Sequence, residues 1–481
     1  MDFRPIFLIV GMLLATLALT MLVPAAVDAF AGHADWQVFA MSAGVTLFVG
    51  VAMALTCRAG DMQLSIHQAF AMTTLSWLLL ATFATIPFVF SELRLSFTDA
   101  FFEAMSGFTT TGSTVIVGLD KAPPGILVWR SLLQWLGGLG IIVIAIAVLP
   151  MLRVGGMQLF RMESSDRSEK ALPRAAQIAS AIGIIYVVLT GIIAIAYWLA
   201  GMSGFDAINH TMTTIATGGY STHDNSIGHF DNVKIEMIAI VGMLAGSLPL
   251  VLYLRTIQGK PLAVLSDGQV QWYLSIIAMV VVSTAAWLWL QSGVHPLTAL
   301  RQAAFNIVSV ITTTGYATAD YGLWGSFVIP VFFFITFVGG CSGSTAGGIK
   351  IFRIQVLYAA ARMQLRRLAH PHGVFIPHYN RRPISEDVIV SVLSFFFMWF
   401  FIFAVLSLGL GLLGLDFLTA VSAAATAIAN VGPALGPIAG PAGNFSSFPD
   451  AAKWLLAAGM LVGRLELFTV MVMFSRSFWR G

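Results

Sequence analysis

Charged residues are scarce in this chain: Asp, Glu, Lys and Arg together make up 10% of its 481 residues. Soluble domains usually carry about 25% charged residues, so this composition excludes a water-soluble globular enzyme. Lys and Arg total 25 against 22 Asp and Glu, a near-balance that argues against nucleic acid as a partner.

Cysteine is rarer still, because the chain has only Cys57 and Cys341, in separate apolar regions. Two isolated cysteines supply neither a disulfide framework nor a metal cluster. Hydrophobic residues and glycine are abundant instead, at 58% of the chain and 45 residues respectively. The hydrophobic fraction predicts an all-α polytopic membrane protein, and the glycine excess is too large for a simple bundle of apolar helices.

Ten windows of the sequence are long and apolar enough to cross a bilayer, whose hydrocarbon core needs about 20 apolar residues in a helix. The eighth window is interrupted by a run of small residues. The windows are residues 5–23, 38–55, 69–90, 127–149, 178–199, 235–254, 272–290, 327–361, 388–413 and 454–474.

Basic residues gather in four segments that all fall on one side if the ten windows are counted from a cytoplasmic N-terminus marked by Arg4. Because Lys and Arg concentrate in cytoplasmic loops, both termini are predicted to be cytoplasmic. No segment between windows is long enough for a large soluble domain, so we expect no nucleotide bound by this chain. The four segments carry Arg153, Arg161, Arg167, Lys170 and Arg174; Arg255 and Lys260; Arg362, Arg366, Arg367, Arg381 and Arg382; and Arg476 and Arg480.

A fourfold repeat lies between the windows, each unit with a short amphipathic segment followed by a glycine-containing loop. Each segment has about ten residues, too few to cross a bilayer at 1.5 Å per residue, which predicts half-helices that enter the membrane and stop. Asp99, Asp206 and Asp416 are expected to cap their N-termini. The loop glycines, spaced 106, 97 and 117 residues apart (218−112, 315−218, 432−315), are Gly112, Gly218, Gly315 and Gly432. Six residues before them stand Ser106, Met212, Ser309 and Thr426.

The loops after these half-helices are the candidate ion site. The partial negative charge at each half-helix C-terminus attracts cations. A dehydrated K⁺ needs oxygen ligands, which a ring of backbone carbonyls supplies and which glycine allows the backbone to aim. The predicted K⁺ filter comprises Thr110, Thr111 and Gly112; Ala216, Thr217 and Gly218; Thr313, Thr314 and Gly315; and Asn430, Val431 and Gly432.

The run of small residues in the eighth window has two interpretations. Small residues let membrane helices pack closely, usually at four-residue spacing. Here they form a continuous block that does not favour a regular helix, which favours a flexible intramembrane gate. A phosphate-binding loop is excluded because Ile349 separates Gly348 from Lys350. The gate residues are predicted to be Gly339, Gly340, Ser342, Gly343, Ser344, Gly347, Gly348 and Lys350, together with Arg464.

Arg464 falls within the last apolar window, where an unpaired charge costs about 2.5–3.5 kcal/mol on insertion scales. It is either part of a structural ion-pair arrangement, with Glu466 reaching Lys350, or a positive barrier at the waist of the pore. Glu103, in the first half-helix, is a candidate brace for the filter.

Three histidines, His370, His372 and His378, lie in the longest basic segment. They are either a metal site or part of a solvated surface for a partner or anionic lipid. The second interpretation is favoured, because no carboxylate or cysteine joins them before Glu386 and Asp387.

Several motifs together resemble the Trk/Ktr/HKT superfamily of potassium transporters. The four loops read Thr-Thr-Thr-Gly112, Ala-Thr-Gly218-Gly-Tyr, Thr-Thr-Thr-Gly315-Tyr and Ala-Asn-Val-Gly432-Pro. Three further motifs, residues 134–140, 340–350 and 463–469, are also similar to family motifs, and the two extra N-terminal windows indicate the bacterial TrkH type. Ala216 and Asn430 depart from the threonine two residues before the glycine in the other loops.

The resemblance implies K⁺ uptake across the bacterial inner membrane by a homodimer in membrane lipid, working with a cytoplasmic TrkA-type nucleotide-binding regulatory subunit. The retained glycines, Gly112 included, imply selectivity for K⁺. Two N-terminal helices (1–60) would precede four pseudo-symmetric M1–P–M2 units around one pore, at residues 61–155, 170–260, 268–365 and 384–481. The alternative is an alternating-access symporter that couples K⁺ to H⁺ or Na⁺; no catalytic constellation of an enzyme is present in the sequence.

Overall fold

The structure, a computed structural model, describes residues 2–58, 65–147, 171–380 and 382–480. The predicted basic residues from Arg153 to Lys170, and Arg381, lie outside them. The described chain is helical almost throughout, which confirms the all-α prediction. Its two strands, β1 (His378–Tyr379) and β2 (Arg382–Pro383), form one short antiparallel pair.

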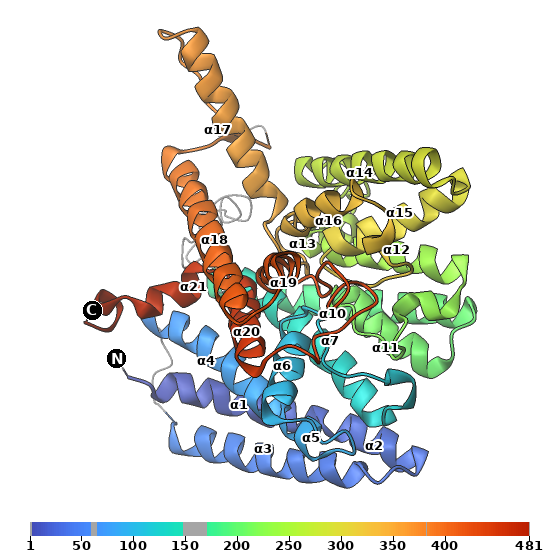
Figure 1. Ribbon diagram of the computed structural model, residues 1–481. Helices are drawn as coiled ribbons and strands as arrows, with labels where there is room; N and C mark the ends of the chain where they lie inside the picture. The colour runs from blue at the N-terminus through green and yellow to red at the C-terminus, as the bar shows by residue number, and fades with distance from the viewer. Residues whose placement is uncertain (1, 59–64, 148–170, 381, 481) are drawn as a thin grey trace.

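The N-terminal helices lie side by side at one edge of the molecule, packed against the first unit through α4 (Ile66–Ala84) and α7 (Pro124–Ala147) (Figure 1). Helices α1 (Arg4–Thr20) and α2 (Leu22–Ala31) run on as one span of 28 residues, and α3 (Trp36–Thr56) packs against α1. Small residues let the two backbones approach closely, as is common between membrane helices. A Cβ atom built on Gly50 would lie 2.7 Å from the carbonyl oxygen of Gly11.

Four units follow, each with a long helix, a short helix, a loop and a second helix that is often broken. The first has α4 (Ile66–Ala84), α5 (Ile86–Phe90), α6 (Phe97–Phe108), η1 (Leu119–Lys121) and α7 (Pro124–Ala147). The second has α10 (Ala171–Leu199), α11 (Gly204–Ile215), η2 (Ser226–Phe230), α12 (Val233–Ser247) and α13 (Leu250–Ile257). The third has α14 (Gly268–Ser292), α15 (Pro296–Ile311), η3 (Tyr321–Leu323), α16 (Val328–Phe337) and α17 (Ile351–Ala369). The fourth has α18 (Glu386–Leu412), α19 (Phe417–Ala429), α20 (Asp450–Arg464), α21 (Phe468–Met471), η4 (Val472–Phe474) and α22 (Arg476–Arg480).

The spans are less regular than the ten apolar windows predict. Within the described residues, seven helices are long and apolar enough to cross a membrane, or nine if two bent pairs count as one span each. Window 235–254 is bent by 93° between α12 and α13. The cause is Pro249, which forces Leu248 into an extended conformation and ends the helix before it. Window 327–361 divides into α16 and α17, as its small residues predict.

The last window, 454–474, is also broken, by 107° after α20. Arg464 is the final residue of α20, and Glu466 has a positive φ of 61° beyond the helix. The last apolar window is therefore not one continuous helix, and Arg464 lies at the break instead of inside a span.

The short helices α6, α11, α15 and α19 are the predicted half-helices, but only one aspartate caps as expected. Asp416 accepts a hydrogen bond from the backbone N–H of Thr419 at 3.1 Å. At α6 and α11 the cap is a serine instead, Ser96 or Ser203, whose hydroxyl accepts from the N–H of Asp99 or Asp206. Each aspartate in turn accepts from that hydroxyl, three residues into the helix, where its negative charge still faces the positive dipole end.

The two ends of the chain lie together (Figure 1). The ring of Phe3 stacks on that of Trp479 with centroids 6.4 Å apart, and the Gln68 amide donates to the carbonyl of Asp2. Both termini are therefore on one side of the molecule, while the C-terminal part of α17 projects away from the helical body (Figure 1).

The close approach of α1 and α3 gives a stability prediction. Gly50→Ala places a methyl group against the backbone of α1, and overpacking of this kind costs about 1–3 kcal/mol. Gly44→Ala is the matched control: Gly44 lies on the same helix, and a Cβ atom built there has no other atom within 4 Å. Size-exclusion chromatography after heating measures the melting temperature. We expect it to be lower for G50A than for the wild type and unchanged for G44A. Equal melting temperatures in the two variants would contradict the close packing.

Candidate cation pathway

The four glycine loops meet in a closed ring. A Cβ atom built on Gly112 would lie within 3.0 Å of the carbonyl oxygen of Gly218, in the next unit. A Cβ atom on three further glycines would likewise lie within 3.0 Å of a carbonyl oxygen of the next unit: Gly219 to that of Thr314, Gly315 to that of Val431, and Gly432 to that of Thr111. Each unit thus presents a glycine to a carbonyl of the following unit, and the fourth returns to the first. We call residues 110–112, 217–219, 313–315 and 430–432 the four-loop ring.

The backbone of this ring repeats one conformation four times. The first and third residues of each triplet have positive φ, with a residue of ordinary φ between them, an alternation suited to aiming successive carbonyls to one side. A positive φ is an outlier for threonine and costs about 1–3 kcal/mol, so it persists only where the surroundings impose it. The φ values are 52° and 88° for Thr110 and Gly112, 51° and 78° for Thr217 and Gly219, 58° and 86° for Thr313 and Gly315, and 56° and 103° for Asn430 and Gly432.

The second loop differs by one residue from the sequence alignment of the repeats. Hydrogen bonds identify the equivalent positions: the middle N–H of each triplet donates to the carbonyl five residues earlier. The bonds are Thr111 to Ser106 (2.9 Å), Gly218 to Thr213 (2.9 Å), Thr314 to Ser309 (2.8 Å) and Val431 to Thr426 (3.1 Å). Gly219, rather than Gly218, is therefore the equivalent of Gly112.

This correction makes the repeat more regular. Ala216 takes the place of Thr109 and Thr312, at the end of its half-helix and before the ring, so its assignment to the ring is wrong. Only Asn430 then departs from threonine at the first ring position. The residues six before the ring glycines are all hydroxyl residues once Thr213 replaces Met212; they are Ser106, Thr213, Ser309 and Thr426.

A buried ion pair braces the first loop from behind. The guanidinium of Arg130 lies 2.8 Å from the carboxylate of Glu103, and both side chains are almost fully buried. Glu103 also accepts from the N–H of Val115 at 3.0 Å, and Arg130 donates to the carbonyl of Ser221 in the second unit at 2.8 Å. Glu103 thus contacts the segment after the first loop directly, as expected of a brace. Its partner Arg130 extends the contact to the second unit.

Other polar side chains bind the equivalent loops. His210, at the position of Glu103, lies 2.9 Å from the hydroxyl of Ser221, and Asn306 accepts from the N–H of Thr318 at 3.2 Å. Gln134 of α7 donates to the carbonyl of Gly218 and accepts from the N–H of Tyr220. These bonds hold the extended segments after the ring against the half-helices.

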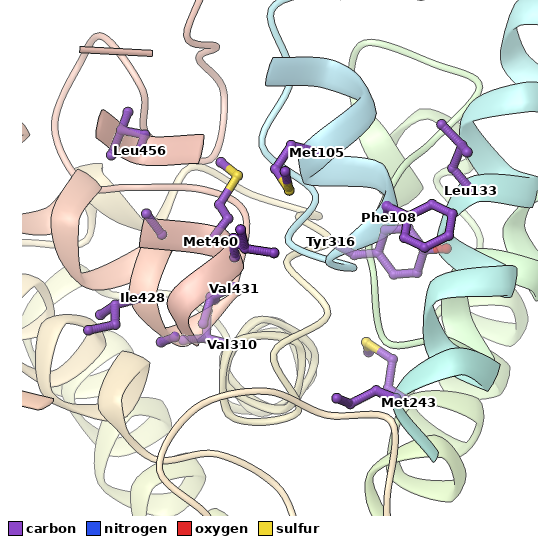
Figure 2. Close-up of a cluster of buried hydrophobic side chains, with 14 of the residues drawn as sticks. Met105, Phe108, Leu133, Met243, Val310, Tyr316, Ile428, Val431, Leu456 and Met460 are labelled. Atoms are coloured by element: carbon purple, nitrogen blue, oxygen red, sulfur yellow. The ribbon is translucent and has the colours of Figure 1, made fainter. Parts of the chain in front are cut away.

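Apolar packing encloses the same region (Figure 2). Side chains from several units converge there, and they belong to one continuous core. Met105 and Phe108 come from α6, Met243 from α12, and Val310 from α15. Met460 of α20 lies close to Val431 of the ring in the same view (Figure 2). Rigid surroundings of this kind are what a strained loop conformation requires.

The segment between α16 and α17, residues 338–350, is the interrupting loop. It has no helix, and its two ends pair as a β-bridge between Val338 and Ile349. Thr345 donates to the carbonyls of Ile215 (3.0 Å) and Gly246 (2.9 Å) and accepts from the hydroxyl of Thr217 (3.1 Å). The N–H of Gly347 donates to the hydroxyl of Thr313 at 2.7 Å. The loop therefore lies against the ring on the side where the half-helices end.

The other predicted gate residues lie in this loop or beside it. Gly339 donates to the carbonyl of Ile349, and the carbonyl of Gly343 accepts from Leu250. Ser342 donates to the side chain of Gln269, and Ser344 to the carbonyl of Cys341. A Cβ atom on Gly340 or Gly348 would meet other parts of the loop, so both permit its tight path.

Arg464 contacts the interrupting loop, donating to the carbonyl of Thr345 at 2.8 Å. It borders a cavity of about 30 Å³ that residues of the loop, Lys350 and Trp399 also line. Its Nε and Nη2 atoms are buried and have no hydrogen-bond partner in the described part of the chain. Glu466 pairs with Arg353 instead, and Lys350 donates to the carbonyl of Ala346, so the predicted contact of Glu466 with Lys350 is wrong.

The three histidines of the longest basic segment lie on the surface of the described chain. His370, His372 and His378 are exposed at or after the end of α17. Among the described residues, the set close enough to share an ion is Asp120, His223 and His229, on the loops that follow the first two ring segments.

Comparison with known proteins gives consistent results over the full length. A family model described as "TrkH: Cation transport protein" matches residues 36–480. The chain is 46% identical to the Trk system potassium uptake protein TrkI of Halomonas elongata, over 99% of this chain and 97% of that protein. It is 39% identical to the TrkH of Escherichia coli K12, with both chains covered completely. The crystal structure of the potassium transporter TrkH from Vibrio parahaemolyticus superposes with a TM-score of 0.93 at 38% identity, covering 100% of both chains.

The Glu103–Arg130 pair gives a second stability prediction. Removing one partner of a buried pair leaves an uncompensated charge and costs about 3–5 kcal/mol. We expect Arg130→Met to lower the melting temperature strongly and the double variant E103Q/R130M to recover part of the loss. Glu92→Gln is the control, because its contact with His33 is exposed and such pairs contribute about 0–1 kcal/mol. A single R130M variant as stable as E92Q would contradict the brace.

Proposed function

Because the chain belongs to the TrkH family of cation transport proteins, we propose that it takes up K⁺ through the four-loop ring. It is a multi-pass membrane protein of four M1–P–M2 units and two N-terminal helices. The observation that carries the proposal is the closure of the ring, in which every unit contributes the same strained triplet and contacts the next. The potassium uptake named for its full-length relatives supports the choice of ion.

In the proposed filter, K⁺ sheds water and is held by oxygens of residues 110–112, 217–219, 313–315 and 430–432. The four half-helices end beside the ring, so their partial negative charges favour a cation there. Asn430 makes the ring uneven: its amide donates to the hydroxyl of Thr111 and to the carbonyl of Met460. Fewer hydroxyls are then available than in a ring of four identical loops.

We propose the interrupting loop as the gate. Its hydrogen bonds to Thr217 and Thr313 support this role, because they hold the loop against the ring on the side where the half-helices end. Arg464 holds the loop through Thr345 and adds a positive charge that opposes cation leak. Opening the path then requires the loop to leave these hydrogen bonds.

We propose that a cytoplasmic partner controls the gate through α17, because this helix follows the interrupting loop directly. Its last part is exposed and carries Arg362, Arg366 and Arg367, a surface suited to a cytoplasmic TrkA-type nucleotide-binding subunit. This side is then cytoplasmic, as are both termini, in the bacterial inner membrane. A homodimer within the lipid is part of the same proposal.

Four parallel units around one ring favour a pore over an alternating-access symporter, whose repeats are often inverted. Flux measured on liposomes with opposed ion gradients separates the two. Uphill K⁺ movement driven by a H⁺ or Na⁺ gradient would favour the symporter.

Substitution of a ring glycine is expected to weaken discrimination between K⁺ and Na⁺. Gly112→Ser adds a side chain at φ 88° against the carbonyl of Gly218, so the neighbouring loop must shift. Gly118→Ser is the matched control: its φ of 80° is equally strained, but nothing lies within 4 Å of the added atom. The measurement is the ratio of K⁺ to Na⁺ flux in liposomes. The same ratio in G112S and G118S would contradict the filter assignment.

Removal of Arg464 is expected to raise K⁺ flux in the absence of a partner subunit. Arg464→Ala removes both the bond to Thr345 and the positive charge, whereas Arg464→Lys keeps the charge. We expect R464A to leak K⁺ faster than wild type and R464K to leak at an intermediate rate. Unchanged flux in a correctly folded R464A protein would rule out the barrier.

A further inference from the structure

The segments that follow the first two ring loops bring together one aspartate and two histidines. Asp120 lies in η1, eight residues after Gly112 (120−112), and His223 lies four residues after Gly219 (223−219). His229 lies in η2. One ligand atom from each side chain lies within 4.8 Å of the other two. The three residues come from two different units, so the cluster joins these units beyond the ring.

One distance between ligand atoms in the cluster is shorter, and another longer, than the distance between two ligands of a bound metal ion. His223 Nδ1 lies 2.5 Å from Asp120 Oδ1, and His229 Nδ1 lies 3.9 Å from the same oxygen. Ligands bound at about 2.0–2.2 Å in tetrahedral geometry are about 3.3–3.5 Å apart. The side chains of Asp120 and His229 are 44% and 43% exposed and have room to rotate. Binding one ion requires Asp120 and His229 to rotate, because the Asp120–His223 contact is too short and the Asp120–His229 contact too long. The ring of His229 must also leave its parallel stack on His223, since the in-plane lone pairs of two parallel rings do not meet at one ion.

The surroundings hold the two loops of the cluster together. The imidazoles of His223 and His229 stack with centroids 3.5 Å apart, and Phe230 packs edge-on against both. The carboxylate of Asp224 accepts from the N–H groups of Gly118 and Leu119, which ties the turn that carries Asp120 to the histidine loop. The two loops are thus already docked before any ion binds.

The donor set selects the class of ion. Two imidazole nitrogens and one carboxylate oxygen suit Zn²⁺ and similar transition metals, and three protein ligands leave one position open to water. Ca²⁺ and Mg²⁺ prefer oxygen ligands alone. His223 Nε2, on the far side of its ring, lies 3.4 Å from the carboxylate of Asp206 without a hydrogen bond, on the side where a carboxylate orients a metal-binding imidazole.

We propose that Asp120, His223 and His229 bind a divalent transition-metal ion of the Zn²⁺ type beside the mouth of the cation pathway. The binding itself is independent of the transport proposal. Its consequence rests on the proposed function: a divalent charge at the mouth repels incoming K⁺ and links two of the four loops, so uptake slows.

The test is isothermal titration of ZnCl₂ into purified full-length protein from which any histidine tag has been removed. We expect one Zn²⁺ per chain, with affinity lowered in H229A and in D120N by more than the ~10–100-fold that loss of a supporting group costs. His33→Ala is the control, since His33 contacts Glu92 at 2.9 Å outside the cluster. MgCl₂ is expected to give no binding at this site.

Absence of Zn²⁺ binding to the wild type, or equal affinity in H229A and H33A, would overturn the site. The consequence is tested by K⁺ flux into liposomes: added Zn²⁺ should slow wild type and H33A but not H229A. Equal slowing of all three would overturn the link to uptake. A metal-free wild type without K⁺ flux would instead contradict the proposed function and leave the binding result intact.

Discussion

The contact between a glycine of one unit and a carbonyl of the next is the constraint on which the rest of this structure depends. Four units of unequal sequence must each present a residue without a side chain at the same place, or the ring cannot close. Closure is accompanied by a threonine or asparagine in a left-handed conformation two residues before each glycine. That strain is held by the half-helices, the Glu103–Arg130 brace and the packed core around them. Many of the buried polar side chains near the ring thus hold the four loops in one strained backbone conformation.

A single chain allows the units to carry different roles. The first and second units are joined by Arg130 and by the contact of Asp120 with His223. The second and third meet at Glu236 and Arg301, and the fourth meets the first at Lys453 and Asp99. The interrupting loop belongs to the third unit alone and Arg464 to the fourth. Four identical subunits would have to carry all of these features in every copy or in none.

The sequence predicts the architecture because short amphipathic segments and apolar windows recur at nearly constant spacing. Its error in the second loop has a simple cause: Gly218 and Gly219 are adjacent, and either satisfies the pattern. The 107-residue interval between Asp99 and Asp206 (206−99) is the signal that decides for Gly219. Pro249 likewise marks a broken helix that hydropathy alone treats as continuous.

Contacts between segments far apart in the chain could not be predicted from the sequence. Arg353 with Glu466, Arg464 with Thr345, and Asp120 with His223 join residues 113, 119 and 103 positions apart. Nothing local in the chain indicates these partners, because they depend on how the four units fold together. The composition marks Arg464 as unusual, but its neighbour is set by the break after α20.

The hydrogen bonds of Thr345 and Gly347 to ring threonines have a thermodynamic consequence. Whatever occupies or rearranges Thr217 and Thr313 changes the free energy of the interrupting loop, and displacement of the loop changes the free energy of the ring by the same amount. If the ring is the filter, as proposed, ion occupancy and loop position are linked quantities rather than successive events. In the proposed function, a ligand that acts on α17 from one side of the membrane would therefore alter the affinity of the ring for an ion that arrives from the other.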